Sequence, residues 1–219
     1  MRNLVFIISA ADELMMAENN IPEQWLVNLQ NIDQATNRIS DFLNDLLVVA
    51  KEEKGRLTVC RCEVDLKSLA EDVVAKSDVL AQGRKVVLLA HVPETVGMVN
   101  LDVNLIRRML DNLLSNAIKF SPVGGTVTLE VDVTHAANDL KLNSRRVRFK
   151  VFDEGPGIDE QDYDRIFEYF KTVPGFQANS PQIGLGLTLC KLVAEAHEGS
   201  ILISANNPTG SIFEVDING

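Results

Sequence analysis

The hydrophobic period of the chain changes near residue 56, and this change limits the class of fold that the chain can adopt. Before that point, an apolar stripe repeats at alternating spacings of four and three residues, through Trp25, Leu29, Ile32, Thr36, Ile39, Leu43, Leu46 and Ala50. This spacing is the heptad seam of a coiled coil. After it, short β-prone runs alternate with helical stretches at about 66–80, 103–119 and 186–197. The sequence therefore predicts an α+β protein with two domains, at 1–56 and 57–219.

The first domain is expected to be a helical hairpin. A shorter stripe of Leu4, Ile8, Ala11 and Met15 precedes the main one, and the sequence AENNIPEQ between them is typical of a turn. Two helices alone bury little apolar surface, so we expect two hairpins to pair in a homodimer as a four-helix bundle. The alternative is a single long helix packed on its own domain, but little else in the chain is helical enough to cover it.

The second domain is expected to be a two-layer α/β sandwich. Its β-prone runs are RLTVCRC, KVVLLA, TVTLEVDV, RVRFKVFD, SILISAN and SIFEVDI. Their alternation with helices predicts one sheet that helices cover on one face. The polar segment THAANDLKLNSRR is expected to be a hairpin loop between two strands.

Composition argues against two classes of partner. The formal net charge is −10, which disfavours nucleic acid, because affinity for phosphate backbones comes from clustered Lys and Arg. No apolar run approaches the length of a membrane span, and no signal peptide is visible. We therefore expect no nucleic acid, no membrane contact by this segment, and a cytoplasmic location, alone or within a larger protein. Cys60, Cys62 and Cys190 are expected to be reduced structural thiols.

A polar ridge is predicted on the helix that contains RRMLDNLLSNAIKF, residues 107–120. At 100° per residue, the side chains of Arg108, Asn112, Asn116 and Lys119 fall within about 80° of one another. A carboxamide oxygen is a hard ligand suited to Mg²⁺, and Lys is a point charge suited to phosphate. A solvated helix face is the ordinary alternative for such a stripe.

Two glycine-containing segments add to this ridge. In VFDEGPGI, an apolar strand leads Asp153 into a turn with Gly155 and Gly157, where a buried carboxylate can accept a hydrogen bond from an exocyclic amine such as that of adenine. An ordinary Asp–Gly turn is the alternative. In QIGLGLTLCK, Gly184 and Gly186 lead into a helix, whose free N–H groups suit an anion such as phosphate. The polar segment 171–182 before it is expected to be a mobile lid, anchored by Phe167 and Phe170.

The order and spacing of these segments resemble the N, G1, F and G2 boxes of the histidine kinase catalytic domain. That domain belongs to the superfamily that includes gyrase, MutL and the heat-shock chaperones. The resemblance covers residues 60–219, and HEGSILISANNPTGSIFEVDI is similar to the closing strands of that family.

The resemblance implies an ATP site in which each matching residue has a role. Asn116 would hold Mg²⁺, while Asn112 and Lys119 would contact phosphate. Asp153 would bind the adenine amino group. The backbone positions that would admit the base and the phosphates are Gly155, Gly157, Gly184, Leu185 and Gly186.

One position separates the branches of the superfamily. Members that hydrolyse ATP carry a Glu four residues before the Mg²⁺-binding Asn, and here that position is Asn112. A carboxamide cannot act as a general base, and the neighbouring Asp111 is turned about 100° away on the helix. We therefore expect a site that holds ATP for transfer, and we assign no catalytic residue in this chain.

The hairpin resembles the dimerisation and phosphotransfer domain of the same kinases, without its phosphoaccepting histidine. Aligned without gaps, Arg2 matches the Arg of the His-Glu-Leu-Arg-x-Pro-Leu motif, Leu4 replaces its Pro, and the His would lie two positions before Met1. None of the three histidines, His91, His135 and His197, lies on the hairpin. The chain is either a piece cut inside the motif or a variant that lost the acceptor. Gln182 is a second departure, because the family has the first Gly of its G2 box there.

The expectation is thus the cytoplasmic kinase core of a two-component sensor histidine kinase. Such a core is a histidine protein kinase that passes the γ-phosphoryl group of Mg·ATP to a histidine and then to the receiver domain of a response regulator. This chain alone is predicted not to autophosphorylate. The alternative is a non-catalytic scaffold that dimerises and docks a regulator or kinase. A hydrolytic ATPase is disfavoured by the absent Glu.

Overall fold

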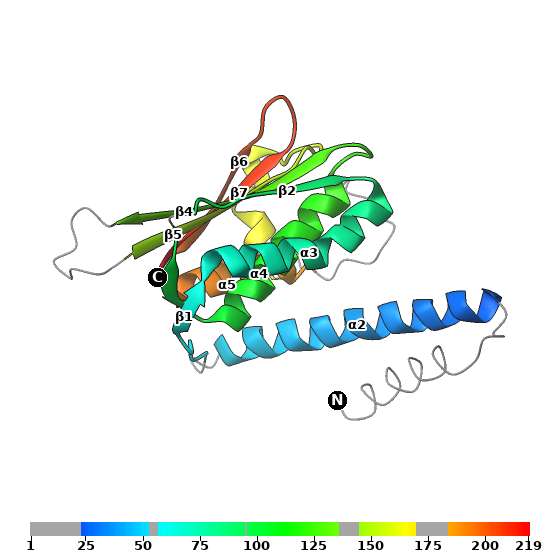
Figure 1. Cartoon of the computed structure of the whole chain (residues 1–219), viewed down its shortest axis with the longest axis horizontal. Coiled ribbons are helices and arrows are strands. Elements are labelled where there is room, and N and C mark those ends of the chain that lie inside the picture. The colour runs from blue at the N-terminus through cyan, green and yellow to red at the C-terminus, as the bar shows by residue number, and fades with distance from the viewer. Residues whose placement is uncertain (1–22, 53–56, 95, 136–144, 170–183) are drawn as a thin grey trace. The chain divides into compact units, whose positions relative to one another are not determined.

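The computed structural model describes residues 23–52, 57–94, 96–135, 145–169 and 184–219. The chain divides into two compact units, Met1–Lys51 and Glu52–Gly219. Each unit is described by itself below, with the element labels of Figure 1.

The described part of the first unit is a single long helix, α2 (Glu23–Glu52), in agreement with the heptad stripe. Several stripe residues remain open to solvent: Ile32, Ile39, Leu43 and Leu46 are 47%, 50%, 40% and 38% exposed. The predicted first helix of the hairpin lies outside the described residues. Helix α2 therefore presents an apolar seam with free surface, as a helix that pairs with others would.

The second unit is built on a five-stranded sheet in the order β2-β4-β5-β7-β6. Strands β2 and β4 are parallel, and every other neighbouring pair is antiparallel. The strands are β2 (Val87–His91), β4 (Thr126–His135), β5 (Arg145–Phe152), β6 (Ser200–Ala205) and β7 (Ser211–Asn218). The predicted loop, residues 134–146, is shorter in the structure, because β4 continues through His135 and β5 begins at Arg145. Residues 136–144 are outside the described residues.

Three helices lie on one face of this sheet, as the sequence predicted (Figure 1). They are α3 (Leu66–Arg84), α4 (Val103–Phe120) and α5 (Gly186–Ala196). Asp65 and Asp102 begin α3 and α4, because each carboxylate accepts backbone N–H groups of the first turn. The apolar face of α4, which includes Ile106, Leu110 and Leu113, is fully buried and fixes which side of the helix is left for polar residues.

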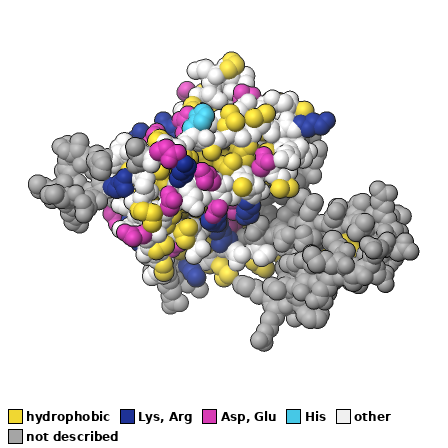
Figure 2. Space-filling view, in the orientation of Figure 1, with side chains coloured by type: hydrophobic (Ala, Val, Ile, Leu, Met, Phe, Trp, Pro, Cys, Tyr) yellow, Lys and Arg dark blue, Asp and Glu magenta, His cyan; other side chains and the backbone are white. Residues whose placement is uncertain are grey.

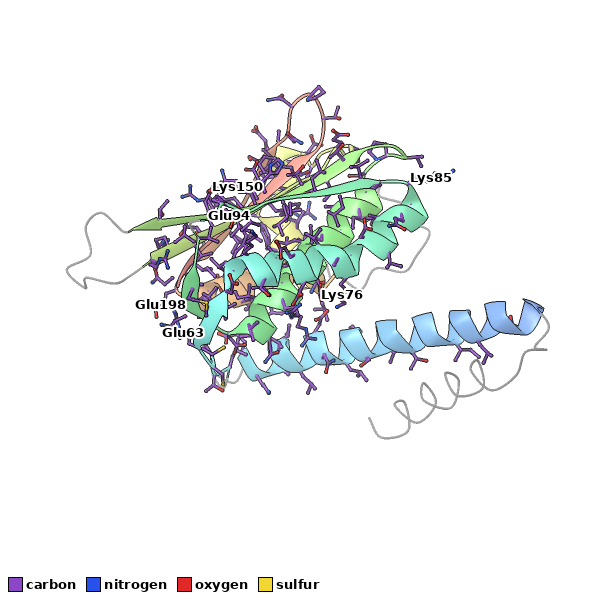
Figure 3. All side chains as sticks on the ribbon, viewed as in Figure 1. Glu63, Lys76, Lys85, Glu94, Lys150 and Glu198 are labelled. Atoms are coloured by element: carbon purple, nitrogen blue, oxygen red, sulfur yellow. The ribbon has the colours of Figure 1, made fainter. Side chains whose placement is uncertain are left out.

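The strands alternate between this core and an open, charged face. On β5, Val147, Phe149 and Val151 are buried, and Arg148 and Lys150 between them are not. On the open face Arg148 pairs with Asp216 on β7 at 3.0 Å, and Lys150, labelled in Figure 3, pairs with Glu214 at 2.8 Å. One layer of helices is therefore enough to bury the sheet, and the unit has two layers.

A separate two-stranded ribbon differs from the prediction. The run RLTVCRC was expected to be a strand, but only its last residue belongs to one: β1 spans Cys62–Asp65. Its partner is β3 (Met98–Leu101), which we did not predict, in antiparallel register with Cys62 opposite Leu101. Asp65 is both the last residue of β1, opposite Met98, and the residue that caps α3, so the strand ends where the helix begins. Two 3₁₀ turns, Glu160–Asp162 and Arg165–Phe167, follow β5.

The surface of the second unit carries both signs of charge. Figure 2 shows acidic and basic side chains interspersed on the visible face, with hydrophobic side chains between them. Within the described residues, none of the helices combines the length and apolar character needed to cross a membrane.

Candidate functional site

Asp153 follows the last residue of β5 and is buried, with only 5% of its surface exposed. Its Oδ1 atom accepts two backbone hydrogen bonds, from the N–H of Gly155 at 2.8 Å and from that of Ser211 at 3.1 Å. The other oxygen, Oδ2, takes part in neither bond. Burial raises the pKa of the Asp153 carboxyl above its usual value, and the two backbone donors offset part of this shift. The result is a fixed carboxylate with one oxygen left to accept from a ligand.

The turn after Asp153 needs its glycines because of close approaches. A Cβ atom at Gly155 would lie 2.9 Å from Asp153 Oδ1 and 3.1 Å from the carbonyl oxygen of Phe120. Gly157 has a φ of +78°, a conformation that side chains rarely adopt. The turn is thereby packed against the C-terminal end of α4.

The predicted polar ridge is present on α4. Asn112, Asn116 and Lys119 are all half-buried, and the Asn112 amide nitrogen donates to the Arg108 carbonyl at 3.0 Å. Asp111 is turned aside, as the helical geometry required, and its carboxylate pairs with Lys76 of α3 at 2.6 Å (Lys76 is labelled in Figure 3). Asp111 is the one acidic residue of α4, so no carboxylate of this helix lies beside Asn112 on the ridge.

The Gly184–Gly186 segment adjoins the same helix. Gly184 has a φ of +70°, Leu185 is buried, and α5 begins at Gly186. A Cβ atom at Gly186 would lie 2.6 Å from Asn112 Oδ1, so the start of α5 is in direct contact with the ridge. The free N–H groups of the first turn of α5 are thus close to the Asn112 amide.

Helix α4 connects the two glycine turns. Asn112 meets Gly186, Phe120 meets Gly155, and Asn116 lies one helical turn from each of these two α4 residues. Lys119 lies beside Phe120, with its Nζ 5.6 Å from the centre of the Phe120 ring. The structure therefore brings together three segments that are separate in the sequence.

The whole of the expected lid and one of its expected anchors lie outside the described residues. These are residues 171–182, with Gln182, and the expected anchor Phe170. The other expected anchor, Phe167, is half-buried, whereas its neighbour Ile166 is the buried residue of this turn.

Sequence reasoning missed the contribution of the β6–β7 turn. Ser211 supplies a backbone N–H to Asp153, and Gly210, with a φ of +116°, lies against the Asp153 carbonyl. Backbone donors carry no side-chain signal, so the only available hint was the glycine immediately before a predicted strand.

His197 has a structural role. It is fully buried, its Nε2 accepts from the N–H of Asp102 at 3.2 Å, and its Nδ1 donates to the carbonyl of Val193 at 2.8 Å. Burial lowers the pKa of His197, which keeps the ring neutral with the proton on Nδ1. The Asp102 carboxylate also accepts the N–H of Cys60 at 2.8 Å. This cluster joins the segment before β1 and the start of α4 to the end of α5.

Comparison with known proteins shows the family to which the sequence is similar. Residues 101–218 match the family described as Histidine kinase-, DNA gyrase B-, and HSP90-like ATPase. The chain is 32% identical over 209 residues to the Adaptive-response sensory kinase SasA of Crocosphaera subtropica, which covers 93% of this chain and 52% of that protein. The chain thus spans about half the length of the curated relative.

Solved structures share the fold. ShkA full-length in complex with AMPPNP superposes with a TM-score of 0.73 at 23% identity, covering 99% of this chain and 43% of that one. The complex of histidine kinase ThkA with response regulator protein TrrA gives a TM-score of 0.63 at 22% identity, covering 99% and 58%. Because the family model matches more than half of the sequence, this chain belongs to the histidine kinase-, DNA gyrase B- and HSP90-like ATPase family.

Proposed function

We propose that this chain is the Mg·ATP-binding core of a sensor histidine kinase. The observation that carries the proposal is the position of α4, which contacts both the buried Asp153 turn and the glycine turn before α5. A ligand with a base at one end and phosphates at the other can lie along such a helix. The pairing of a single buried acceptor with a helix N-terminus fits an adenine nucleotide.

Each residue has a role in this proposal. Asp153 Oδ2 accepts from the adenine amino group, while Gly155 and Gly157 leave room for the base. Lys119 adds positive charge near phosphate, and Gly184, Leu185 and Gly186 offer backbone N–H groups to it. The amide oxygen of Asn116 is a suitable ligand for Mg²⁺, which would neutralise phosphate charge.

The site favours transfer over hydrolysis because it lacks a general base. Asn112 occupies the position where a base would stand, and its amide nitrogen is engaged with Arg108. Asp111 is paired with Lys76 and lies on another side of α4. Holding the reactants in place and neutralising charge is sufficient for phosphoryl transfer, so the acceptor can be a histidine side chain in place of water.

The acceptor is proposed to lie outside the histidines of this chain. His197 is buried and engaged by backbone groups, and His91 lies near Glu130 on the sheet, 3.6 Å from its carboxylate. We therefore expect no stable phosphate on this chain after incubation with Mg·ATP. Radiolabel that remained on the chain and disappeared in an Asn116→Ala variant would contradict this expectation.

The partners follow from the exposed seam of α2. Pairing of two copies through Ile32, Ile39 and Leu43 would give the homodimer. As the cytoplasmic kinase core of a two-component system, the protein would pass phosphate through a histidine to the receiver domain of a response regulator. The same seam would serve a non-catalytic scaffold, which needs dimerisation but no nucleotide. Loss of the biological effect in an Asn116→Ala variant would count against the scaffold.

The decisive experiment is calorimetric titration with ATP, with and without Mg²⁺. We expect binding that depends on Mg²⁺ and that Asn116→Ala weakens by at least about tenfold, since hydrogen-bond and metal contacts to charged groups contribute about 1.5–3 kcal/mol. Asn104→Ala is the matched control, because Asn104 is an exposed Asn on the first turn of the same helix.

Two results would oppose the proposal. Absence of ATP binding by the intact chain would leave the scaffold as the better hypothesis. Steady release of inorganic phosphate that depends on Asn116 would instead favour a hydrolytic ATPase.

A further inference from the structure

The turn between β6 and β7 wraps around Asp153. The side-chain Nδ2 of Asn206 donates to the Asp153 carbonyl oxygen at 2.8 Å, across 53 positions of sequence. The backbone N–H of Asn206 donates to the carbonyl of Gly210 at 3.0 Å, which closes the turn and fixes where the Asn206 side chain begins. Asn206 is therefore held in place before it contacts Asp153.

The same turn surrounds the Asp153 peptide on its other sides. The Asp153 N–H donates to the Ser211 carbonyl at 3.0 Å, and Ser211 returns its own N–H to Asp153 Oδ1. A Cβ atom at Gly210 would lie 1.9 Å from the Asp153 carbonyl oxygen, so the two backbones are in contact. Within this closely packed turn, the Asp153 carbonyl oxygen accepts a hydrogen bond from the side-chain amide of Asn206.

The direction of that carbonyl decides where the carboxylate points. The Asp153 carbonyl and the Glu154 N–H belong to one planar peptide group, and rotation of this plane moves Glu154 and, after it, Gly155. Gly155 provides one of the two N–H groups that hold Oδ1, at 2.8 Å. A carbonyl released from Asn206 would lose this donor, which favours rotation toward another donor. Oδ2 would then turn away from its position.

We propose that Asn206 is a positioning residue that aims the Asp153 carboxylate and so sets the preference of the site for a 6-aminopurine over a purine without that amino group. The inference rests on the proposed function, because it takes Asp153 as the acceptor for the amino group. Asn206 itself touches neither base nor phosphate in this scheme. It acts through the peptide group of Asp153.

The test compares two nucleotides that differ in one group. Calorimetry gives the Kd of Mg·ATP and of the Mg²⁺ complex of purine riboside triphosphate, which carries hydrogen in place of the 6-amino group. For the intact chain we expect ATP to bind at least about tenfold more tightly, the contribution of a hydrogen bond to a charged acceptor. Asn206→Ala and Asn206→Asp should reduce this ratio to about threefold or less. The Asp variant keeps the size of the side chain but lacks the N–H donor.

Asn207→Ala is the matched control, because Asn207 is an exposed Asn in the same turn. It should keep the ratio of the intact chain. Thermal melting by circular dichroism identifies any variant that fails to fold. If one Asn206 variant is unfolded, the ratio of the two Kd values is taken from the other Asn206 variant. A residue that merely stabilised the turn would weaken both nucleotides equally and leave the ratio unchanged.

The outcomes separate the inference from the function on which it rests. A reduced ratio in both Asn206 variants, with Asn207→Ala unchanged, supports the inference. An intact chain that prefers ATP together with folded Asn206 variants that keep the full preference overturns the inference and leaves the proposed function standing. An intact chain that binds neither nucleotide, or both equally, overturns the role of Asp153 and the inference with it.

Discussion

Substitution of Gly186 by Ala tests whether the start of α5 and the α4 ridge form one site. The new Cβ atom would lie 2.6 Å from Asn112 Oδ1 and 3.3 Å from its Cγ, while ordinary contacts between heavy atoms of this kind are near 3.5 Å. The Asn112 amide must therefore move by roughly 1 Å. It can do so because it is the end of a flexible side chain, but it gives up its bond to Arg108.

The expected magnitude follows from these contacts. Loss of the bond from Asn112 to Arg108, 3.0 Å long and partly buried, costs about 0.5–1.5 kcal/mol. Replacing Gly by Ala at a helical position returns up to about 1 kcal/mol, so the stability of the unliganded chain should change little. Because the displaced Asn112 amide no longer lies beside Gly186, in the proposed phosphate site, we expect the affinity for ATP to fall about five- to tenfold. This factor corresponds to a loss of binding free energy of about 1–1.4 kcal/mol.

A double-mutant cycle measured by calorimetry with Mg·ATP checks this mechanism. Gly186→Ala and Asn112→Ala should each weaken binding by about the same factor, and the double variant should bind no worse than Asn112→Ala alone. The expected coupling is about 1 kcal/mol. Gly83→Ala is the matched control, because a Cβ atom at Gly83 has no neighbour within 4 Å. Additivity of the two substitutions to within about 0.4 kcal/mol would refute the reasoning, since it would mean that Gly186 does not act through Asn112.

Three further outcomes are expected. Asp153→Asn keeps an oxygen for both backbone donors, so the chain should fold but should bind ATP at least about tenfold more weakly by calorimetry. Burial raises the pKa of Asp153 above 3.8, so the stability of this variant relative to the parent, measured by urea unfolding, should increase as pH rises from about 4 through the folded pKa. A stability difference that does not change with pH would contradict this. Burial lowers the pKa of His197 below 6.5, so the contribution of His197 to stability is present above pH 6.5 and is lost as pH falls through the folded pKa. Melting temperatures measured from pH 8 to 5 should show this loss. The melting temperature of the His197→Gln variant should depend less on pH over the same range. Gly210→Ala places a Cβ atom 1.9 Å from the Asp153 carbonyl oxygen, and it should lower the free energy of unfolding in urea by about 3 kcal/mol or more. The control is Gly124→Ala, at a glycine that also has a positive φ but no neighbour within 4 Å, and it should lower this free energy by about 1 kcal/mol. Equal losses in the two variants would mean that the contact at Gly210 is not tight.

The elements that could be predicted from the sequence are those with long, regular patterns. Helix α4 has an apolar face that repeats over five turns and an Asp at its start, and β5 alternates over eight residues. The ribbon of β1 and β3 escaped prediction because each strand has four residues, too few for a period to be visible. Each of these strands depends on a partner more than 30 residues away, which local propensity does not encode.

The candidate site divides along a similar line. Asp153, Asn112 and Gly186 could be singled out because residue type and spacing indicated their chemistry. Which of them would touch depended on the tertiary fold: Asn112 with Gly186, and Gly155 with Phe120. The backbone groups of the β6–β7 turn left no trace in residue type, since any residue other than Pro at position 211 would have the same N–H group.

The order of strands in the sheet has a consequence for how the protein is made. Strand β7 is the last of the five to be synthesised, yet it lies inside the sheet, between β5 and β6, and its first residue, Ser211, holds the Asp153 carboxylate. A nascent chain that has produced only β2, β4 and β5 has an unpaired sheet edge and an Asp153 held by one donor instead of two. During translation, nucleotide binding would therefore come after closure of the sheet, and a bound nucleotide would report that the domain is complete.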